Sequence, residues 1–207
     1  MYSDLFSASS VQDLMAVLPS LPYAIWETFY VTVLSTLLSL VLGLPLGVLL
    51  VAGEKNGVLP LPRWLLQVLN VIINLLRSVP FLILMIMVFP LSRLIIGTAV
   101  GTTATIVPLV VAAFPFVARL VETSLRELDE GVVEAAQSMG ATPFQIITKV
   151  MIPECLPGLI SSMTTALTTI LGYSAMSGVI GGGGLGKIAL SYGYYRYQTN
   201  IMIVCVV

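Results

Sequence analysis

The stretch EAAQSMGATPFQIITKVMIP, residues 134–153, lies in the only long polar segment of an otherwise apolar chain. Nine of the 19 charged residues of the protein fall within residues 119–154. We expect two short helices in this segment. The first covers residues 128–139 and carries acidic side chains in its first turn, where the helix dipole favours negative charge. The second begins with Thr142 as the N-cap and Pro143 as the first helical residue, because these residue types suit those positions.

The composition indicates that most of the remaining chain lies in a membrane. The 207 residues are 57% hydrophobic and 9% charged, and the mean hydropathy is +1.03. Soluble domains carry roughly 25% charged residues, so this chain has too little polar surface for a soluble globule. The net charge of −1 offers no basic surface to a nucleic acid. The sequence contains no histidine, and Cys155 and Cys205 have no metal-binding spacing. We therefore expect an all-α polytopic membrane protein with no catalytic and no metal site.

Charged residues mark where the chain can leave the bilayer, because a charge at its centre costs several kcal/mol. We expect one transmembrane domain over residues 1–207. Its five predicted membrane-spanning helices cover about residues 21–53, 64–96, 102–122, 155–179 and 198–207. Arg77 and Pro80 interrupt the second span, which we interpret as one long helix that is tilted or broken there. The fifth span is too short to cross, so we expect the sequence to stop inside its last helix.

The distribution of Lys and Arg predicts the orientation of the chain. Five spans place residues 54–63 and 119–154 on the same side of the membrane, and this side carries more Lys and Arg than the other. Positively charged loops favour the cytoplasm. We therefore expect residues 127–150 in the cytoplasm and the N-terminus outside.

A glycine-rich stretch, GGGGLGK, resembles the start of a phosphate-binding loop. Gly181, Gly186 and Lys187 fit the spacing G-x-x-x-x-G-K. The next residue in such a loop is a Ser or Thr that holds magnesium, but here it is Ile188. The predicted orientation also places the stretch outside, where ATP is absent. We interpret it as a flexible turn that leads into a short external helix, and we expect no ATPase site in this chain.

The polar segment carries a surface of small residues that another protein could approach closely: Ala135, Ala136, Gly140 and Ala141. Two interpretations are open on physical grounds. The segment is either an amphipathic loop that lies on the membrane or a docking element for a cytosolic partner.

The spacing within the segment resembles a signature of bacterial ABC importer permeases. In these proteins E-A-A is followed by three residues, Gly, nine residues and I-x-L-P. This chain has Glu134-Ala135-Ala136, Gly140 and Val150-Met151-Ile152-Pro153 at the same spacing, with Val in place of Ile and Ile in place of Leu. The resemblance implies the type I importer permease fold, with a cytoplasmic coupling helix that docks in a cleft of the ATPase subunit. It assigns the coupling role to Glu134, Ala135, Ala136, Gly140, Ala141, Thr142 and Pro143.

Further stretches, including NLLRSVPFLILM and LGYSAMSGVIGGGGLG, are similar to the permeases of methionine importers. This resemblance covers most of the chain from Trp26 onward. It implies a multi-pass protein of the bacterial inner membrane that forms a homodimer. Its implied partners are two ATP-binding subunits, which bind ATP and magnesium, and an external methionine-binding lipoprotein. The implied activity is the import of L- and D-methionine by alternating access.

Several residues are candidates for the translocation pathway. Tyr173, Ser174 and Met176 lie in a segment of small residues that either packs closely against another helix or closes the pore. Arg77 is a charge within a predicted span, so it either meets the substrate carboxylate, pairs with an acidic residue or extends to the interface. Pro80 is expected to kink its helix at the cavity.

The sequence leaves two alternative functions open. An ABC permease for another amino acid or small solute would share the same signature. An ion-coupled secondary transporter would need buried carboxylates, whereas the acidic residues are expected in loops, in the tail or, for Glu27, near a span end.

Overall fold

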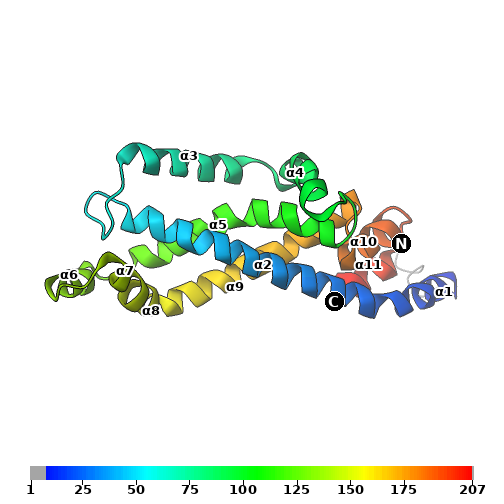
Figure 1. Ribbon diagram of the computed structural model, residues 1–207. Helices are drawn as coiled ribbons and strands as arrows, with labels where there is room; N and C mark the ends of the chain where they lie inside the picture. The colour runs from blue at the N-terminus through cyan, green and yellow to red at the C-terminus, as the bar shows by residue number, and fades with distance from the viewer. Residues whose placement is uncertain (1–7, 207) are drawn as a thin grey trace. The chain divides into compact units, whose positions relative to one another are not determined.

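The computed structural model describes residues 8–206, and all regular secondary structure in this range is helical (Figure 1). Residues 1–7 and 207, and the parts of the predicted domain and last span that fall on them, lie outside the described residues. The chain forms two compact units. Unit 1 takes its residues from the ranges 1–35, 85–109 and 169–207, and unit 2 from the ranges 36–84 and 110–168.

Helices occupy the segments in which spans were predicted. The long helices are α2 (Leu21–Ala52), α5 (Ile106–Arg126) and α9 (Leu156–Ser177), together with the shorter α3 (Arg63–Ser78) and α4 (Phe81–Ile96). By length and apolar character, two helical stretches, Gln12–Ala52 and Thr103–Arg126, can cross a membrane. Two bent helix pairs raise the number to four among the described residues if each pair forms one span. The count of five remains a prediction.

The second predicted span is broken at the proline. Helix α3 ends at Ser78, and α4 begins at Phe81. The two helices meet at an angle of 111°. Val79 has a ψ of 130°, the extended backbone that a residue before proline favours. The Pro80 carbonyl then accepts hydrogen bonds from the amides of Ile83 and Leu84, which starts α4. The chain thus adopts the broken form of the two arrangements considered.

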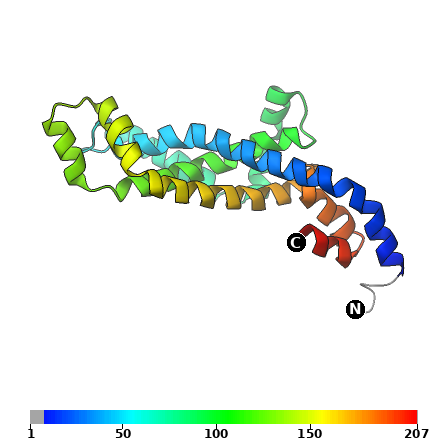
Figure 2. The same ribbon diagram turned by 90° about the horizontal axis from the view of Figure 1, so that it is seen from below.

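The core of unit 2 is built where α2, α5 and α9 run side by side (Figures 1 and 2). Its buried members come from all three helices and from the polar segment: Val48, Ala52, Val117, Val121, Leu125, Ala136, Ile146, Met151, Cys155, Leu159 and Ala166. Two glycines of α2 allow the close approach of α5. A Cβ atom on Gly43 would overlap Val117, and one on Gly47 would lie 2.6 Å from the Ala118 carbonyl oxygen. Small residues are the usual means of close helix packing in membranes.

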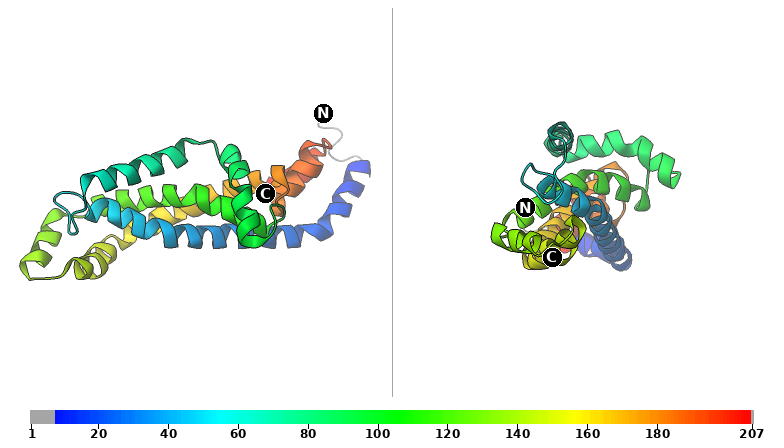
Figure 3. Two further views of the ribbon diagram at one scale, coloured as in Figure 1. Left: turned by 45° about the horizontal axis from the view of Figure 1, so that its top comes forward. Right: turned by 60° about the vertical axis from the view of Figure 1, so that its left-hand side comes forward.

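Unit 1 contains the two ends of the described chain (Figure 3). Helix α1 (Ala8–Val17), the start of α2, α10 (Gly184–Ile188), the π-helical turn η6 (Ala189–Tyr194) and α11 (Thr199–Val206) belong to it. These elements share a small core formed by Val17, Ala24, Ile188 and Ile201. Tyr192 packs on this core, whereas three further tyrosines of the C-terminal region are exposed: Tyr194, Tyr195 and Tyr197.

Replacing Gly47 with alanine should destabilise unit 2. The added methyl group would lie 2.6 Å from the Ala118 carbonyl and 2.7 Å from the Val121 Cβ, and neither atom can move without a shift of α5. Overpacking of this kind costs about 1–3 kcal/mol, which thermal unfolding in detergent would detect. Gly158→Ala in α9 is the control, because its Cβ would make only ordinary contacts of 3.5 Å with Ser124. Equal melting temperatures for both variants would contradict this packing.

Candidate functional site

The polar segment forms two short helices joined by a turn (Figure 2). Helix α6 (Glu130–Ser138) begins at the N-cap Asp129, whose side chain accepts a hydrogen bond of 2.8 Å from the Gly131 amide. Gly140 lies in the turn with a φ of +76°, a conformation that favours glycine. The segment therefore has a defined local structure encoded by its own sequence.

Helix α7 (Pro143–Ile146) confirms the predicted start of the second helix. Thr142 is the N-cap, and Pro143 is the first helical residue. The Thr142 side chain accepts from the Gln145 amide at 3.4 Å, and the Gln145 side chain accepts from the Thr142 amide at 2.9 Å. This reciprocal capping box satisfies two backbone donors that would otherwise lack partners at the helix start.

The predicted coupling residues all belong to unit 2, but they do not form one exposed surface. Glu134 and Ala135 of α6 and the residues Gly140, Thr142 and Pro143 are exposed, while Ala141 is half-buried. Ala136 is only 3% exposed and lies in the core of unit 2. The prediction of an approachable small-residue surface is therefore wrong for Ala136, because this face of α6 packs inward.

Two large apolar side chains beside these residues were not predicted as part of the site. Met139 is 81% exposed and Phe144 is 74% exposed. They flank the turn at Gly140, whereas Ile146 of α7 is buried in the core. Large exposed apolar side chains are typical of a surface that meets another protein or a membrane, so they fit either interpretation of the polar segment. Sequence alone did not separate Phe144 from Ile146, because the choice of buried face depends on packing.

A charged network lies in unit 2, mainly on the C-terminal part of α5. Arg119 donates hydrogen bonds to Glu122 at 2.5 Å and to the side-chain oxygens of Asn70 and Asn74 of α3 at 2.6 and 3.1 Å. Arg126 donates to Glu122 at 3.0 Å and to Glu54 at 2.5 Å. The network thus connects α3, α5 and the residues after α2.

This network corrects two expectations. The third predicted span includes Arg119 and ends at about residue 122, whereas α5 continues to Arg126. Acidic residues were expected outside the buried parts of the spans, but the Glu122 side chain is only 10% exposed. The two guanidinium groups offset its negative charge, which makes burial of this carboxylate possible.

The predicted pathway residues of α9 belong to unit 1. Met176 is exposed and Tyr173 is half-buried. Ser174 is buried and donates to the Leu171 carbonyl at 2.8 Å, while Thr32 of α2 donates to the Ser174 hydroxyl at 3.4 Å. One side of this α9 segment is therefore held in the protein, and Met176 is available on its surface.

The other two predicted pathway residues, Arg77 and Pro80, belong to unit 2. Both are exposed. Arg77 lies in the last turn of α3, where a positive charge interacts favourably with the helix dipole. Pro80 lies at the break before α4, as described above. The structure gives these residues local roles at helix ends.

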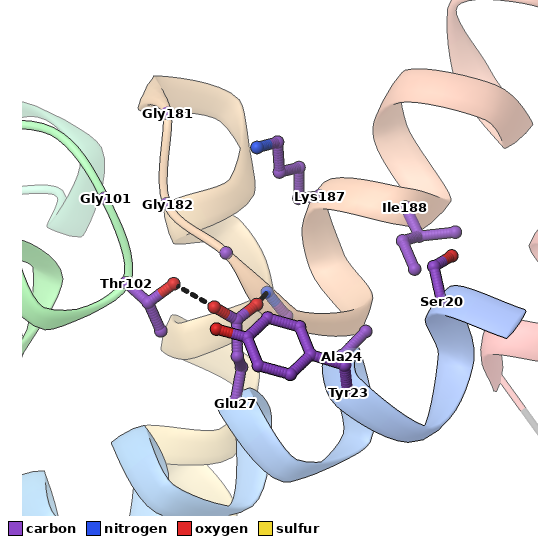
Figure 4. A pocket seen from close by; sticks show the side chains of 12 residues that line it. Ser20, Tyr23, Ala24, Glu27, Gly101, Thr102, Gly181, Gly182, Lys187 and Ile188 are labelled. Atoms are coloured by element: carbon purple, nitrogen blue, oxygen red, sulfur yellow. Dashed lines mark hydrogen bonds between the residues drawn. The ribbon is translucent and has the colours of Figure 1, made fainter.

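The glycine-rich turn is bonded to α2 through a side chain that was not singled out (Figure 4). Glu27 accepts a hydrogen bond from the Thr102 hydroxyl at 2.5 Å and one from the Gly184 amide at 2.8 Å. The neighbouring Thr28 accepts from the Leu185 amide at 2.9 Å. A protein carboxylate thus occupies the backbone donor that a phosphate-binding loop would offer to its ligand. The turn is tied to α2, whereas a flexible connection was expected.

A cavity of about 290 Å³ lies beside these bonds in unit 1. Figure 4 shows the Glu27 carboxylate and the Tyr23 ring on one side and Lys187 on the other. Sequence reasoning gave Glu27 no role because its partners, Thr102 and Gly184, are 75 and 157 residues away along the chain.

Replacing Arg119 with leucine should destabilise unit 2 by about 2 kcal/mol, measured as a lower melting temperature in detergent. Removing one partner of a buried pair costs roughly 3–5 kcal/mol, but Glu122 would keep Arg126 as a partner. Arg126→Ala is the matched control. Its side chain is 48% exposed, so we expect a loss of about 1 kcal/mol or less. The double variant Arg119→Leu/Glu122→Leu should recover much of the loss, and a larger loss in the double variant would contradict the pairing.

Comparisons with known proteins agree with this fold. The profile of the family described as "Binding-protein-dependent transport system inner membrane component" matches residues 43–207. The probable D-methionine transport system permease protein MetI of Vibrio cholerae is 52% identical over 187 residues, which cover 89% of this chain and 81% of the relative. The protein of the same name from Pasteurella multocida is 49% identical over 187 residues, covering 87% and 86% of the two chains.

A solved structure described as inward-facing conformations of the MetNI methionine ABC transporter has a TM-score of 0.86 at 42% identity. The match covers 92% of this chain and 90% of that chain. The all-α permease fold of type I ABC importers is thereby confirmed. The chain belongs to the family of binding-protein-dependent transport system inner membrane components.

Proposed function

We infer that this chain is the membrane permease subunit of an ATP-driven importer that carries methionine across the inner membrane. The observation that carries this proposal is the exposed surface on α6 and the turn that follows, which stands at the signature spacing of ABC permeases. The substrate comes from the relatives, which are named as D-methionine transport permeases, and from the structural match to a methionine ABC transporter. L- and D-methionine are both proposed substrates.

The proposed docking site for a separate ATPase subunit is the coupling surface, which consists of Glu134, Ala135, Met139, Gly140, Ala141, Thr142, Pro143 and Phe144. Glu134 supplies a charge, and Met139 and Phe144 supply apolar area that the rest of this chain leaves exposed. Ala136 and Ile146 anchor the same helices in the core of unit 2. Because the anchors pack against residues of α2, α5 and α9, a movement of the docked ATPase would be passed directly to the membrane helices.

The chain is proposed to work in a complex and to hold no cofactor of its own. Two cytoplasmic ATP-binding subunits would bind ATP and magnesium, a second copy of this chain would complete the pathway, and an external methionine-binding lipoprotein would deliver the substrate. The glycine-rich turn supports the absence of an ATPase site here, because Ile188 follows Lys187 and Glu27 already accepts from the Gly184 amide. The chain would thus be a multi-pass transport subunit and not an enzyme.

The proposed pathway residues are Tyr173, Ser174 and Met176 of α9, with Arg77 and Pro80 at the break between α3 and α4. Met176 suits a gate, because an unbranched and polarizable side chain can repack as the pathway opens. Its exposure in the single chain leaves it available to a second copy across a dimer axis. Buried Ser174 would hold this turn of α9 in place while Met176 moves.

Deleting the gene should abolish uptake of labelled methionine at submicromolar concentration, in cells that have no second methionine system. The intact gene should restore uptake, and unlabelled L- and D-methionine should each compete with the label. Unchanged uptake in the deletion strain would exclude methionine as the substrate. The remaining alternative would then be an ABC permease for another amino acid or small solute.

Glu134→Lys should reduce methionine uptake by roughly tenfold or more, the factor that corresponds to about 1.4 kcal/mol of lost docking free energy. The charge reversal lies on the coupling surface, so the ATPase subunit should also be lost during purification in mild detergent. Glu154→Lys is the matched control, because Glu154 is exposed and lies outside α6 and α7. Full uptake by Glu134→Lys with an intact complex would show that this surface does not dock the ATPase. Transport without any ATPase partner would instead favour an ion-coupled mechanism.

A further inference from the structure

Three segments of unit 1 converge on the Glu27 carboxylate (Figure 4). Glu27 lies in α2, Thr102 lies just before the short helical turn η3 (Thr103–Thr105), and Gly184 lies in the glycine-rich turn after α9. Each carboxylate oxygen accepts one hydrogen bond, from the Thr102 hydroxyl and from the Gly184 amide. Bonds to a charged acceptor are about twice as strong as bonds between neutral groups. Glu27 therefore bonds to two segments at once, in addition to the 3.1 Å hydrogen bond from the Gly101 amide to the Gly181 carbonyl, which also joins them.

Thr28 adds a second bond between α2 and the same turn. Its hydroxyl accepts from the Leu185 amide at 2.9 Å and donates to the Ala24 carbonyl at 3.0 Å. Two consecutive amides of the turn, those of Gly184 and Leu185, are thus bonded to two consecutive side chains of α2. This arrangement satisfies backbone donors at the start of α10.

The glycines of the turn fit closely around the carboxylate. A Cβ atom on Gly183 would overlap the Thr102 hydroxyl and the Glu27 carboxylate. Gly184 is buried and has a φ of +79°, which side chains rarely adopt. Gly183 has a φ of −100°, so only its contacts, and not its backbone, exclude a side chain. Gly183→Ala is therefore a steric probe of the contact with Glu27.

The turn is also packed against the α9 segment that holds the proposed gate. The Gly182 amide donates to the Ser177 carbonyl at 3.0 Å. A Cβ atom on Gly178 would lie 2.6 Å from backbone atoms of Gly186 and Lys187, and one on Gly186 would overlap the backbone of Ala175. The backbone of α10 is therefore in direct contact with the backbone of residues 175–178, the segment that contains Met176.

We propose that Glu27 is a positioning residue for the outer gate. It holds the glycine-rich turn at residues 181–185 against α2, and this turn then fixes the position of the α9 segment that carries Met176. The proposal rests on the proposed function, because it assigns these residues to the outer end of an import pathway. Glu27 acts here through hydrogen bonds to the protein, since both of its oxygens already have donors from this chain. What it supplies is two hydrogen-bonding atoms, one toward the Thr102 hydroxyl and one toward the Gly184 amide, and its negative charge is not itself the functional requirement.

The test measures how accessible the gate is from outside, using Met176→Cys in a chain that also carries Cys155→Ala and Cys205→Ala. The assembled complex, with its ATPase and external binding protein, is treated in intact spheroplasts with a membrane-impermeant maleimide. Adding Glu27→Ala removes both hydrogen bonds to the carboxylate. It should raise the labelling rate at position 176 by roughly tenfold or more, because the loss of one charge-assisted hydrogen bond alone corresponds to about tenfold. In proteoliposomes, the same Glu27→Ala change should lower the methionine imported per ATP hydrolysed.

Conservative variants separate the acceptor role from a role of the charge. Glu27→Gln keeps an oxygen that can accept from the Gly184 amide, and its NH2 group can donate to the Thr102 hydroxyl, which is able to accept. Both bonds can therefore persist, and the labelling rate should stay within about twofold of the reference, below the size of one hydrogen bond. Gly183→Ala should raise labelling because its methyl group displaces the carboxylate. Gly158→Ala, which makes only ordinary contacts in unit 2, should not. The effect of Gly183→Ala should be smaller in the Glu27→Ala background, because the two changes break the same contact.

Unchanged labelling in Glu27→Ala and in Gly183→Ala would overturn the proposal. Equal effects of Glu27→Gln and Glu27→Ala would also overturn it, because the charge would then be required, as it is for binding a cation or an ammonium group. If Glu27→Ala fails to assemble, Gly183→Ala and Thr28→Val must still raise labelling. The labelling assay contains no substrate, so it is separate from the proposed function. Failure of the unmodified complex to import methionine would reject that function whatever the thiol at position 176 shows.

Discussion

A carboxylate that leaves water in this apolar chain must find its partner within the protein, and this constraint shapes both units. A buried carboxylate without a partner would cost several kcal/mol. In unit 2, Glu122 is held between Arg119 and Arg126. In unit 1, Glu27 is held by the Thr102 hydroxyl and by the Gly184 amide. Each cluster ties together segments that are distant in sequence, so polar satisfaction fixes how the helices of each unit meet.

Close backbone approach is the second means by which the helices are held. Gly43 and Gly47 bring α2 against α5 in unit 2, and Gly178 and Gly186 bring α9 against α10 in unit 1. Apolar side chains provide little drive for helix association in lipid, because lipid tails are as apolar as they are. Small residues let the helix backbones approach closely, so that extensive van der Waals contact stabilises the association. The 17 glycines of this chain therefore contribute to packing as well as to turns.

The polar segment shows how one short stretch can serve both packing and docking. Ala136 and Ile146 face the core of unit 2, whereas Glu134, Met139 and Phe144 face outward. The capping box at Thr142 and Gln145 fixes where the second helix begins, and so fixes which residues turn inward. Behind this segment, Arg126 is bonded to Glu54 and Glu122. A partner docked on the exposed face would thus act on a part of the membrane helices that the ion pairs of Arg126 hold together. This geometry fits an importer driven by a separate ATPase. It fits an ion-coupled transporter less well, because the buried Glu122 is already neutralised by two guanidinium groups.

The sequence by itself determined the features that depend on composition or on neighbours within one turn of helix. The membrane class follows from apolar content, the position at which the second span is interrupted from Arg77 and Pro80, and the start of α7 from the capping preferences of Thr142 and Pro143. Only the structure decided that α5 continues past residue 122 to Arg126 and that the second span is broken and not tilted. It also decided that Ala136 is buried while Phe144 is exposed, and that Glu27 binds the glycine-rich turn. The physical reason is distance along the chain. Caps and proline effects act between adjacent residues, whereas the partners of Glu27 are 75 and 157 residues away and those of Arg119 on α3 are 45 and 49 residues away. Such contacts exist only once the helices have packed.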